Sequence, residues 1–326
     1  RIQLAGSRSK SDAAKACSVR IDGYDWLWII ERICHELTEA LEEGEPIVYL
    51  DGDGPTVDDE AFLLDHIIRE RSHALLFATG GTGKSVFALG ACAAIQSGSN
   101  DILSLPVGDS VNTLYLDFED EEGTARARLQ AICGAWGIPI PKVRYKRAES
   151  SLPTMADALA RQIAREKIGF KVIDSVALAC GADPEKAVAA TDYFRTLRAI
   201  RIPATLSIAH QTKLSDKYPF GSIFWQNAPR SVWRIRGTKD ETNGDLTKIG
   251  LFHTKVNNGR LEPAIGYKIR FSDTGILFTT DKPAKEAAFR SEFGLREQIW
   301  NLLAEGTYTR EEMAELLEAP LLQVRA

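Results

Sequence analysis

Ala78-Thr-Gly-Gly-Thr-Gly-Lys-Ser85 is the stretch that decides the fold of this 326-residue chain. It follows the apolar run Ala74-Leu-Leu-Phe77 and leads into the helical pattern Val86-Phe-Ala-Leu89. A strand, a glycine-rich turn and a helix in this order are typical of a phosphate-binding P-loop. The stretch therefore predicts an α/β fold, with the loop at the end of a central strand.

The residue types of this loop suit a bound nucleotide. Glycines lack Cβ, so successive backbone N–H groups can surround an anion. Lys84 would reach the β- and γ-phosphates of ATP, and Ser85 would bind Mg²⁺. The residues expected to contact the cofactor are Thr79, Gly80, Gly81, Thr82, Gly83, Lys84 and Ser85. The motif normally has glycine at position 78, where this chain has Ala78, and we expect a small effect; the plain alternative is a glycine-rich turn without a ligand.

Two further strands end in acidic residues. Phe170-Lys-Val-Ile-Asp174 resembles a Walker B strand, in which Asp174 would hold Mg²⁺ through water. Leu114-Tyr-Leu-Asp-Phe-Glu-Asp120 is the other, and Glu119 is the candidate base that positions the attacking water. An acid after a strand is often only a helix cap, and Asp120 suits that role.

A third polar strand end follows in Thr205-Leu-Ser-Ile-Ala-His210. His210, with Gln211 as second choice, is the candidate donor to a γ-phosphate. A single histidine is usually structural, and only its position after the Walker B strand favours a role in the site.

The composition excludes several classes of protein. The chain is 44% hydrophobic and 26% charged, which argues against disorder, collagen and disulfide scaffolds. The five cysteines are scattered without a CxxC pair, and no apolar run is long enough to cross a bilayer. We expect a cytoplasmic protein with no membrane partner.

The net charge of −5 is an average over unlike regions. Residues 201–270 hold 12 Lys/Arg against five Asp/Glu, a local charge of +7, although the mean argues against a basic nucleic-acid coat. Nucleic-acid binding, if present, is therefore expected from this stretch.

Alternating short apolar runs and helical patterns predict three regions. Residues 1–60 are expected to be a flexible segment followed by a helix at 25–43, and residues 61–281 a mostly parallel sheet with helices on both faces. Late strands without helices, from residue 231 to 279, predict antiparallel additions to the sheet. Residues 282–326 predict a small helical domain similar to a partial winged helix-turn-helix, although a helical pair for protein contact is as good an interpretation.

The order P-loop, strand-end Glu119, Asp174 and strand-end His210 resembles the RecA-like ATPase core. Within that superfamily the chain resembles the RepA-type hexameric replicative helicases, relatives of the DnaB helicases, over about residues 60–278. The segments that carry the resemblance are GGTGKS (80–85), LYLDFED (114–120), VIDSVAL (172–178), SIAHQTK (207–213), GSIFWQNAPR (221–230) and HTKVNNGR (253–260).

The resemblance implies a nucleotide bound between subunits of a homo-oligomeric ring, expected to be a hexamer. Arg230 falls at the place of the arginine finger supplied by the neighbour, and Lys255 at that of a second basic finger. The DnaB pattern has an arginine two residues after that lysine, where this chain has Asn257. The plain alternative for both cations is a solvated surface charge.

In such rings the loop after the histidine strand faces the central channel. Here that loop would bring Lys213, Lys217 and Tyr218 to single-stranded DNA, because cations follow phosphates and an aromatic ring stacks on a base. A polar crossover loop without a ligand is an equally good interpretation.

These features together predict a Mg-ATP-hydrolysing ring motor that translocates on single-stranded DNA and unwinds duplex DNA, with other replication proteins as further partners. Two rivals remain: a RecA-like ATPase for recombination, regulation or phage defence without unwinding, and a nucleotide-gated DNA-binding regulator. A P-loop kinase is a distant third, since no acceptor-site or lid motif is visible.

Overall fold

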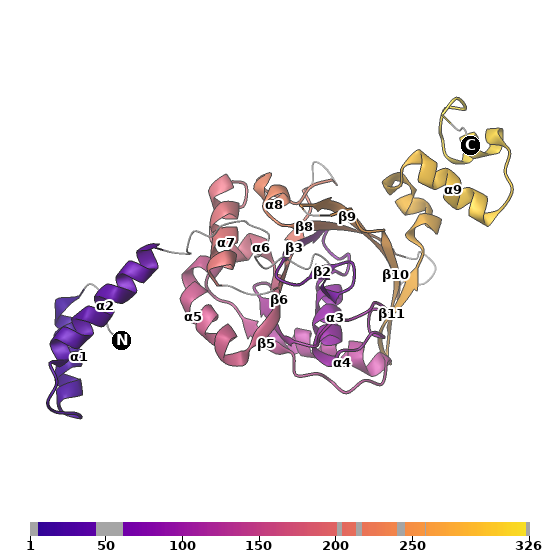
Figure 1. Ribbon diagram of the computed structural model, residues 1–326. Coiled ribbons are helices and arrows are strands. Elements are labelled where there is room, and N and C mark those ends of the chain that lie inside the picture. The colour runs from indigo at the N-terminus through magenta and orange to yellow at the C-terminus, as the bar shows by residue number, and fades with distance from the viewer. Residues whose placement is uncertain are drawn as a thin grey trace. The chain divides into compact units, whose positions relative to one another are not determined.

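The computed structural model describes residues 6–43, 61–200, 204–212, 217–239, 245–257 and 259–323. The chain divides into two compact units, residues 1–57 and 58–326, which are described separately (Figure 1). The boundary expected from the sequence, at residue 60, lies between the described parts of the two units. No described helix is long and apolar enough to span a membrane.

The first unit contains two helices, α1 (Ser7–Ser18) and α2 (Trp26–Glu43). The expectation of a flexible N-terminal segment was wrong for residues 7–18. Ala14 of α1 packs with Ile30 and Cys34 of α2, so the small side chains of α1 form an apolar contact stripe within a polar sequence. The Asp25 carboxylate accepts a hydrogen bond from the Trp28 amide at 3.1 Å and begins α2.

The second unit is built on a nine-stranded sheet with the order β11-β10-β9-β8-β3-β7-β6-β4-β5. The strands from β8 to β5 in this order are parallel, and β9, β10 and β11 are antiparallel additions. The prediction of antiparallel additions from residue 231 onward is confirmed for β9, β10 and β11 and was wrong for β8, which pairs parallel to β3. The parallel strands are β3 (His73–Ala78), β4 (Asn112–Asp117), β5 (Arg144–Arg147), β6 (Ile168–Asp174), β7 (Ala204–His210) and β8 (Ser231–Lys239). The antiparallel strands are β9 (Leu246–Val256), β10 (Ile265–Ser272) and β11 (Gly275–Asp281).

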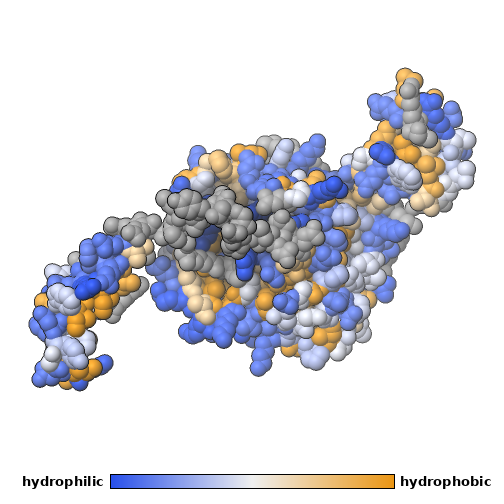
Figure 2. Space-filling model, viewed as in Figure 1, coloured by the Kyte–Doolittle hydropathy of each residue, from blue (hydrophilic) through white to orange (hydrophobic). Residues whose placement is uncertain are grey.

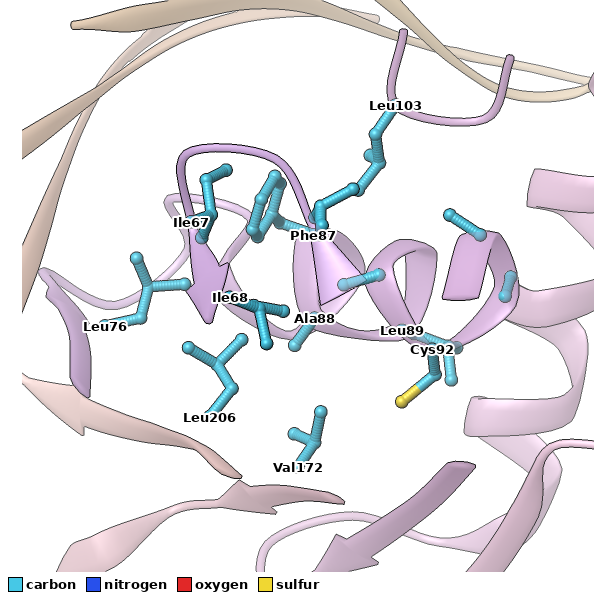
Figure 3. Packing of buried hydrophobic residues seen from close by; sticks show 14 of the residues in the cluster. Ile67, Ile68, Leu76, Phe87, Ala88, Leu89, Cys92, Leu103, Val172 and Leu206 are labelled. Carbon is cyan, nitrogen blue, oxygen red and sulfur yellow. The ribbon is translucent and has the colours of Figure 1, made fainter. Parts of the chain in front are cut away.

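Helices cover both faces of the sheet, which explains why β3 and β6 are buried along almost their whole length. The helices α3 (Lys84–Ser97) and α4 (Glu122–Ala135) pack on one face. The other face carries α5 (Leu152–Glu166), α6 (Val176–Ala179), α7 (Ala187–Ala199) and α8 (Phe224–Asn227). In Figure 3, Phe87, Ala88 and Cys92 of α3 lie over Leu76, Val172 and Leu206, which come from three neighbouring strands.

Two elements near the start of this unit were not predicted from the sequence. The strands β1 (Phe62–Leu64) and β2 (Ile68–Arg69) form a small antiparallel hairpin. Its residues Leu64, Ile67 and Ile68 join the core under α3. The hairpin therefore closes the end of that core next to β3.

The last part of the unit begins with a strap, residues 283–293, made of two short helices, η1 (Pro283–Lys285) and η2 (Ala287–Glu292). Phe289 and Phe293 of the strap pack on Phe252 of β9. The helices α9 (Leu295–Glu305) and α10 (Arg310–Leu316) follow, with Ile299 and Met313 in a small core. Thr309 and Glu312 form a capping box at the start of α10, and residues 321–323 form a turn.

Candidate nucleotide site

The P-loop connects the end of β3 to the start of α3, as the sequence predicts. Gly81 and Gly83 have φ values of 74° and 88°, in the left-handed region where a side chain is strained. Gly83 directly precedes the first turn of α3. The loop therefore presents its backbone N–H groups and the positive end of α3 to the same space, which is the arrangement that binds phosphate.

The departure from the P-loop pattern at Ala78 has a structural explanation. Ala78 is the last residue of β3 and lies in register with His210 of β7. Its carbonyl accepts a hydrogen bond of 3.0 Å from the Gln211 amide. Ala78 continues the strand and is not among the residues with positive φ, so the position makes no demand for glycine.

Lys84 is 6% exposed and its side chain folds back over the loop. Its amine donates hydrogen bonds to the carbonyl oxygens of Ala78, at 3.2 Å, and Thr79, at 2.7 Å. Burial lowers the pKa of this amine, whereas the nearby carboxylates of Asp174 and Glu119 raise it. The Lys84 amine thus lies at the phosphate loop, close to the predicted base Glu119 and the predicted Mg²⁺ ligand Asp174.

Asp174 ends β6 and is 5% exposed. Its carboxylate accepts hydrogen bonds from the Ser85 hydroxyl and, at 2.6 Å, from the Tyr115 hydroxyl. Burial raises the pKa of Asp174, and these two hydrogen bonds oppose the rise. The pair of Ser85 and Asp174 fits Mg²⁺, which in nucleotide sites takes one or two protein ligands and completes its shell with phosphate oxygens and water.

The position of Glu119 is fixed by a turn after β4. Asp117, the last residue of that strand, accepts hydrogen bonds from the amides of Glu119, at 3.0 Å, and Asp120, at 2.9 Å. The Tyr145 hydroxyl of β5 donates to the same carboxylate at 3.2 Å. Because the turn is held by Asp117, the Glu119 side chain leaves the edge of the sheet in a defined direction.

Glu119 reaches across the ends of two more strands. Its carboxylate accepts a hydrogen bond from the Ser175 hydroxyl, directly after β6, and lies 3.3 Å from Nε2 of His210 at the end of β7. The side chains of His210 and Glu119 are 42% and 37% exposed, so water can reach this pair. The structure thus brings together Lys84, Ser85, Glu119, Asp174 and His210 at the edge where the parallel strands end, called here the carboxyl edge.

Asp120 has a structural environment. Its carboxylate accepts a hydrogen bond of 2.9 Å from the Glu121 amide and lies 3.2 Å from a guanidinium nitrogen of Arg128. The hydrogen bond from Glu121 is the main reason that the pKa of Asp120 is lowered. Asp120 is not the cap considered from the sequence, because the residue that caps α4 is Glu121 and Asp120 lies just before it.

Arg230 and Lys255, the predicted fingers, lie at the opposite edge of the sheet, called here the amino edge. The Arg230 amide donates a hydrogen bond of 3.0 Å to the carbonyl of His73, the first residue of β3. Lys255 lies in register with Val232 near the start of β8, and its amine donates to the carbonyls of Asn227, at 2.8 Å, and Pro229. Burial lowers the pKa of the Lys255 amine. The Lys255 amine is thus engaged within its own chain, next to Arg230.

The predicted DNA-binding residues belong to the segment after β7. Lys213 lies outside the described residues, whereas Lys217 and Tyr218 are described and exposed. The Phe220 amide donates a hydrogen bond of 2.7 Å to the His210 carbonyl, and Gln211 forms a bridge with Pro219. The exposed rings of Tyr218 and Phe220 therefore belong to a turn that begins at His210, the candidate donor to the γ-phosphate.

Part of the basic stretch at 201–270 is neutralised within the chain. Glu292 of the strap pairs with Arg234 and with Arg236, the latter at 2.6 Å. Lys248 pairs with Glu286 at 2.7 Å, and Lys268 with Asp281 at 3.1 Å. The excess of positive charge counted from the sequence is consequently reduced on β8, β9 and β10.

Sequence reasoning missed three residues that shape this site: Asp117, Tyr115 and Ser175. Asp117 was visible as the first acid of its cluster, and Ser175 follows Asp174 directly. Tyr115 could be found from the alternation of β4, because it shares a face of that strand with Asp117. Their hydrogen bonds form between the ends of three different strands. The spacing of residues within one segment of sequence gives no information about such contacts.

The site and the fold define a P-loop ATPase. A family model described as AAA domain matches residues 37–216, more than half of the chain, and the chain belongs to this family. A comparison with curated proteins found no match. Within the described residues, no three His, Cys, Asp or Glu side chains converge to hold a metal ion without a nucleotide.

Proposed function

We propose that the protein is a Mg-ATP-hydrolysing ring motor of RepA/DnaB-like type, which translocates on single-stranded DNA and unwinds duplex DNA. The proposal has two parts: hydrolysis at a site shared between copies of the chain, and transmission of that cycle to DNA.

The observation that carries the first part is the separation of the predicted catalytic groups. Lys84 and Glu119 lie at the carboxyl edge, whereas Arg230 is tied to His73 at the amino edge. The six residues of β3 separate these edges by about 17 Å, at roughly 3.3 Å per step. Arg230 therefore acts on the nucleotide of a second copy, and a complete site requires assembly.

In the proposed reaction, Glu119 accepts a proton from a water molecule that attacks the γ-phosphorus of ATP. The bond from that phosphorus to the β–γ bridging oxygen breaks, which releases ADP and phosphate. Lys84 and the P-loop amides bind the phosphates, and Arg230 of the second copy compensates the charge that develops on the transferred group. Ser85 and Asp174 would hold Mg²⁺, which would supply further charge compensation.

The second part is supported by the turn that follows His210. A γ-phosphate contacting His210 would act at the base of this turn, and the exposed Tyr218 and Phe220, which return to that base, would contact DNA beside it. Tyr218 is 47% exposed and Phe220 37%, which leaves both rings accessible for stacking on bases. The proposed γ-phosphate contact and one proposed DNA contact are thus joined by the hydrogen bond between the Phe220 amide and the His210 carbonyl.

One experiment tests both parts. The mass of the protein in solution is measured with a non-hydrolysable ATP analogue and single-stranded DNA, alongside ATP hydrolysis and strand displacement on a forked duplex. A hexamer with DNA-stimulated hydrolysis and ATP-dependent displacement supports the motor. Hydrolysis by a ring without displacement favours a RecA-like ATPase that does not unwind, and duplex-specific binding lost on removal of residues 295–326 favours the regulator.

A further inference from the structure

Four polar side chains form a row across the amino edge, on adjacent strands of the sheet. Lys171 of β6 lies in register with Thr205 of β7, which lies in register with His73 of β3. Arg230, which directly precedes β8, is joined to His73 by its backbone hydrogen bond. The order β6-β7-β3-β8 makes these residues direct neighbours, in the part of the sheet around the labels β6, β3 and β8 in Figure 1.

All four residues are on the same face of the sheet. Side chains alternate along a strand, and Ile173, Leu75 and Val232, each two residues from a member of the row, belong to the core under α5 and α7. The row therefore lies at the end of this core, below the last turn of α7. It is on the opposite edge from the P-loop, and of its four members only Arg230 has a role in the proposed hydrolysis.

The inner members of the row are completely buried and lack partners. Lys171 and Thr205 are each 0% exposed. Within the described part of the chain, the Lys171 amine, the Thr205 hydroxyl and Nδ1 of His73 are buried without a hydrogen-bond partner. Buried polar atoms in native proteins are almost always paired, so three exceptions at neighbouring register positions are unusual.

A negatively charged group would suit these three atoms. Burial lowers the pKa of Lys171 to about 7 and, with the positive charges of Lys171, Arg230 and Arg198, lowers the pKa of His73 to about 4. No described carboxylate pairs with any of these four side chains. A buried water could accept the hydrogen bonds, whereas an anion would also favour the charged form of Lys171.

We propose that Lys171, Thr205 and His73 form an oxyanion-binding site, with Arg230 at its rim, that takes a phosphate or carboxylate group. A tetrahedral or planar oxyanion has enough oxygen atoms to accept from all three buried donors at once. The group comes either from a small free anion or from a second copy of the chain. Anion binding by Lys171, Thr205 and His73 does not require ATP hydrolysis. This proposal can therefore be tested separately from the proposed function.

The first test is thermal unfolding with sulfate as probe, against chloride at matched ionic strength. Lys171→Met keeps the length of the side chain and removes the charge, so the variant is expected to fold and to be more stable than the parent in chloride. We expect the apparent affinity for sulfate to fall about tenfold or more in Lys171→Met and in Thr205→Val. Lys186→Met, at an exposed lysine before α7, removes the same charge elsewhere and is expected to respond as the parent does.

Sulfate also stabilises proteins through exclusion from their surfaces, and that effect is common to all variants. Equal responses to sulfate in the parent, Lys171→Met and Thr205→Val would therefore overturn the site and leave a buried water as the partner of Lys171.

The second test observes Lys171 directly. The Cε resonance of Lys171, identified by its absence from Lys171→Met, is followed by NMR on protein labelled with ¹³C in its lysines. Inorganic phosphate should shift this resonance and raise the pKa of the amine, because a bound anion favours the charged form. A response at low protein concentration identifies a free anion, and a response that appears only on assembly with nucleotide identifies a group from a second copy. No response under either condition contradicts the proposal.

Discussion

His210 and Glu119 lie 3.3 Å apart, although 91 residues separate them in the sequence. They meet because β7 and β4 flank β6 and all three strands end at the same edge. The hydroxyl of Ser175, directly after β6, donates to the same carboxylate oxygen of Glu119. In this arrangement the proposed base and the proposed γ-phosphate sensor are partners, so a nucleotide that draws His210 away frees the carboxylate for water.

Replacing Lys84 with Ala should abolish hydrolysis, with a loss of at least about 100-fold in turnover. The amine is the buried cation of the phosphate loop and has no neighbouring lysine to replace it in the described site. Turnover of ATP by Lys84→Ala is measured beside Lys186→Ala, an exposed lysine outside the site. Comparable turnover in the two variants would remove Lys84 from the mechanism.

Glu119→Gln should bind ATP as the parent does and lose turnover by about 10² to 10⁴-fold. The amide keeps the size of the side chain and cannot accept the proton of water. Glu122→Gln, on the exposed first turn of α4, is the matched control and should hydrolyse normally. Nucleotide binding and single-turnover hydrolysis are measured for both, and normal turnover in Glu119→Gln would show that another group is the base.

Arg230→Ala should lose hydrolysis by about 10³-fold or more, although Arg230 lies far from the P-loop of its own chain. Mixed with Lys84→Ala, it should recover part of the activity, because some composite sites then contain an intact Lys84 and an intact Arg230. Hydrolysis is measured as a function of the mixing ratio. If the two variants assemble together and activity does not return, the action of Arg230 on a second copy is refuted.

Lys213→Ala combined with Lys217→Ala should weaken binding of single-stranded DNA and reduce its salt dependence. Two phosphate contacts correspond to a decrease of about 1.4 in the slope of log K against log salt concentration. Fluorescence anisotropy at several salt concentrations measures this slope. An unchanged affinity and slope would separate the turn after β7 from DNA binding.

The stability of the protein should depend on pH through Lys171. Burial lowers the pKa of this amine from 10.5 in the unfolded chain to about 7 in the native state. Between these values the unfolded state binds more protons, so the free energy of unfolding rises with pH, by at most about 1.4 kcal/mol per unit. Below about pH 7 the full destabilisation is present. In a buffer without oxyanions, the stability advantage of Lys171→Met should therefore shrink as the pH is raised from 7 toward 10.

The core of the fold was predictable because its signals are local. The buried run of β3, the glycines of the P-loop and the apolar strands that follow each specify their own element, and parallel strands bring their ends to one edge. The convergence of Lys84, Glu119, Asp174 and His210 follows from that geometry.

Other features could not be predicted, because they depend on contacts between segments that are far apart in the sequence. The helix α1 is polar along most of its length and gains its apolar contact only from α2. The strands β1 and β2 are too short to show the alternation of apolar and polar residues that identifies a strand. The row at the amino edge could not be predicted for a different reason. In the sequence Lys171 is an ordinary residue of a Walker B strand, and only the sheet places Thr205 and His73 beside it.

The strap at residues 283–293 determines where the chain can be shortened. Glu292 neutralises Arg234, whose side chain is 7% exposed, and removing one partner of such a buried pair costs about 3–5 kcal/mol. A fragment ending at residue 281 would also uncover Phe252. The smallest fragment that preserves the ATPase sheet therefore extends through Phe293.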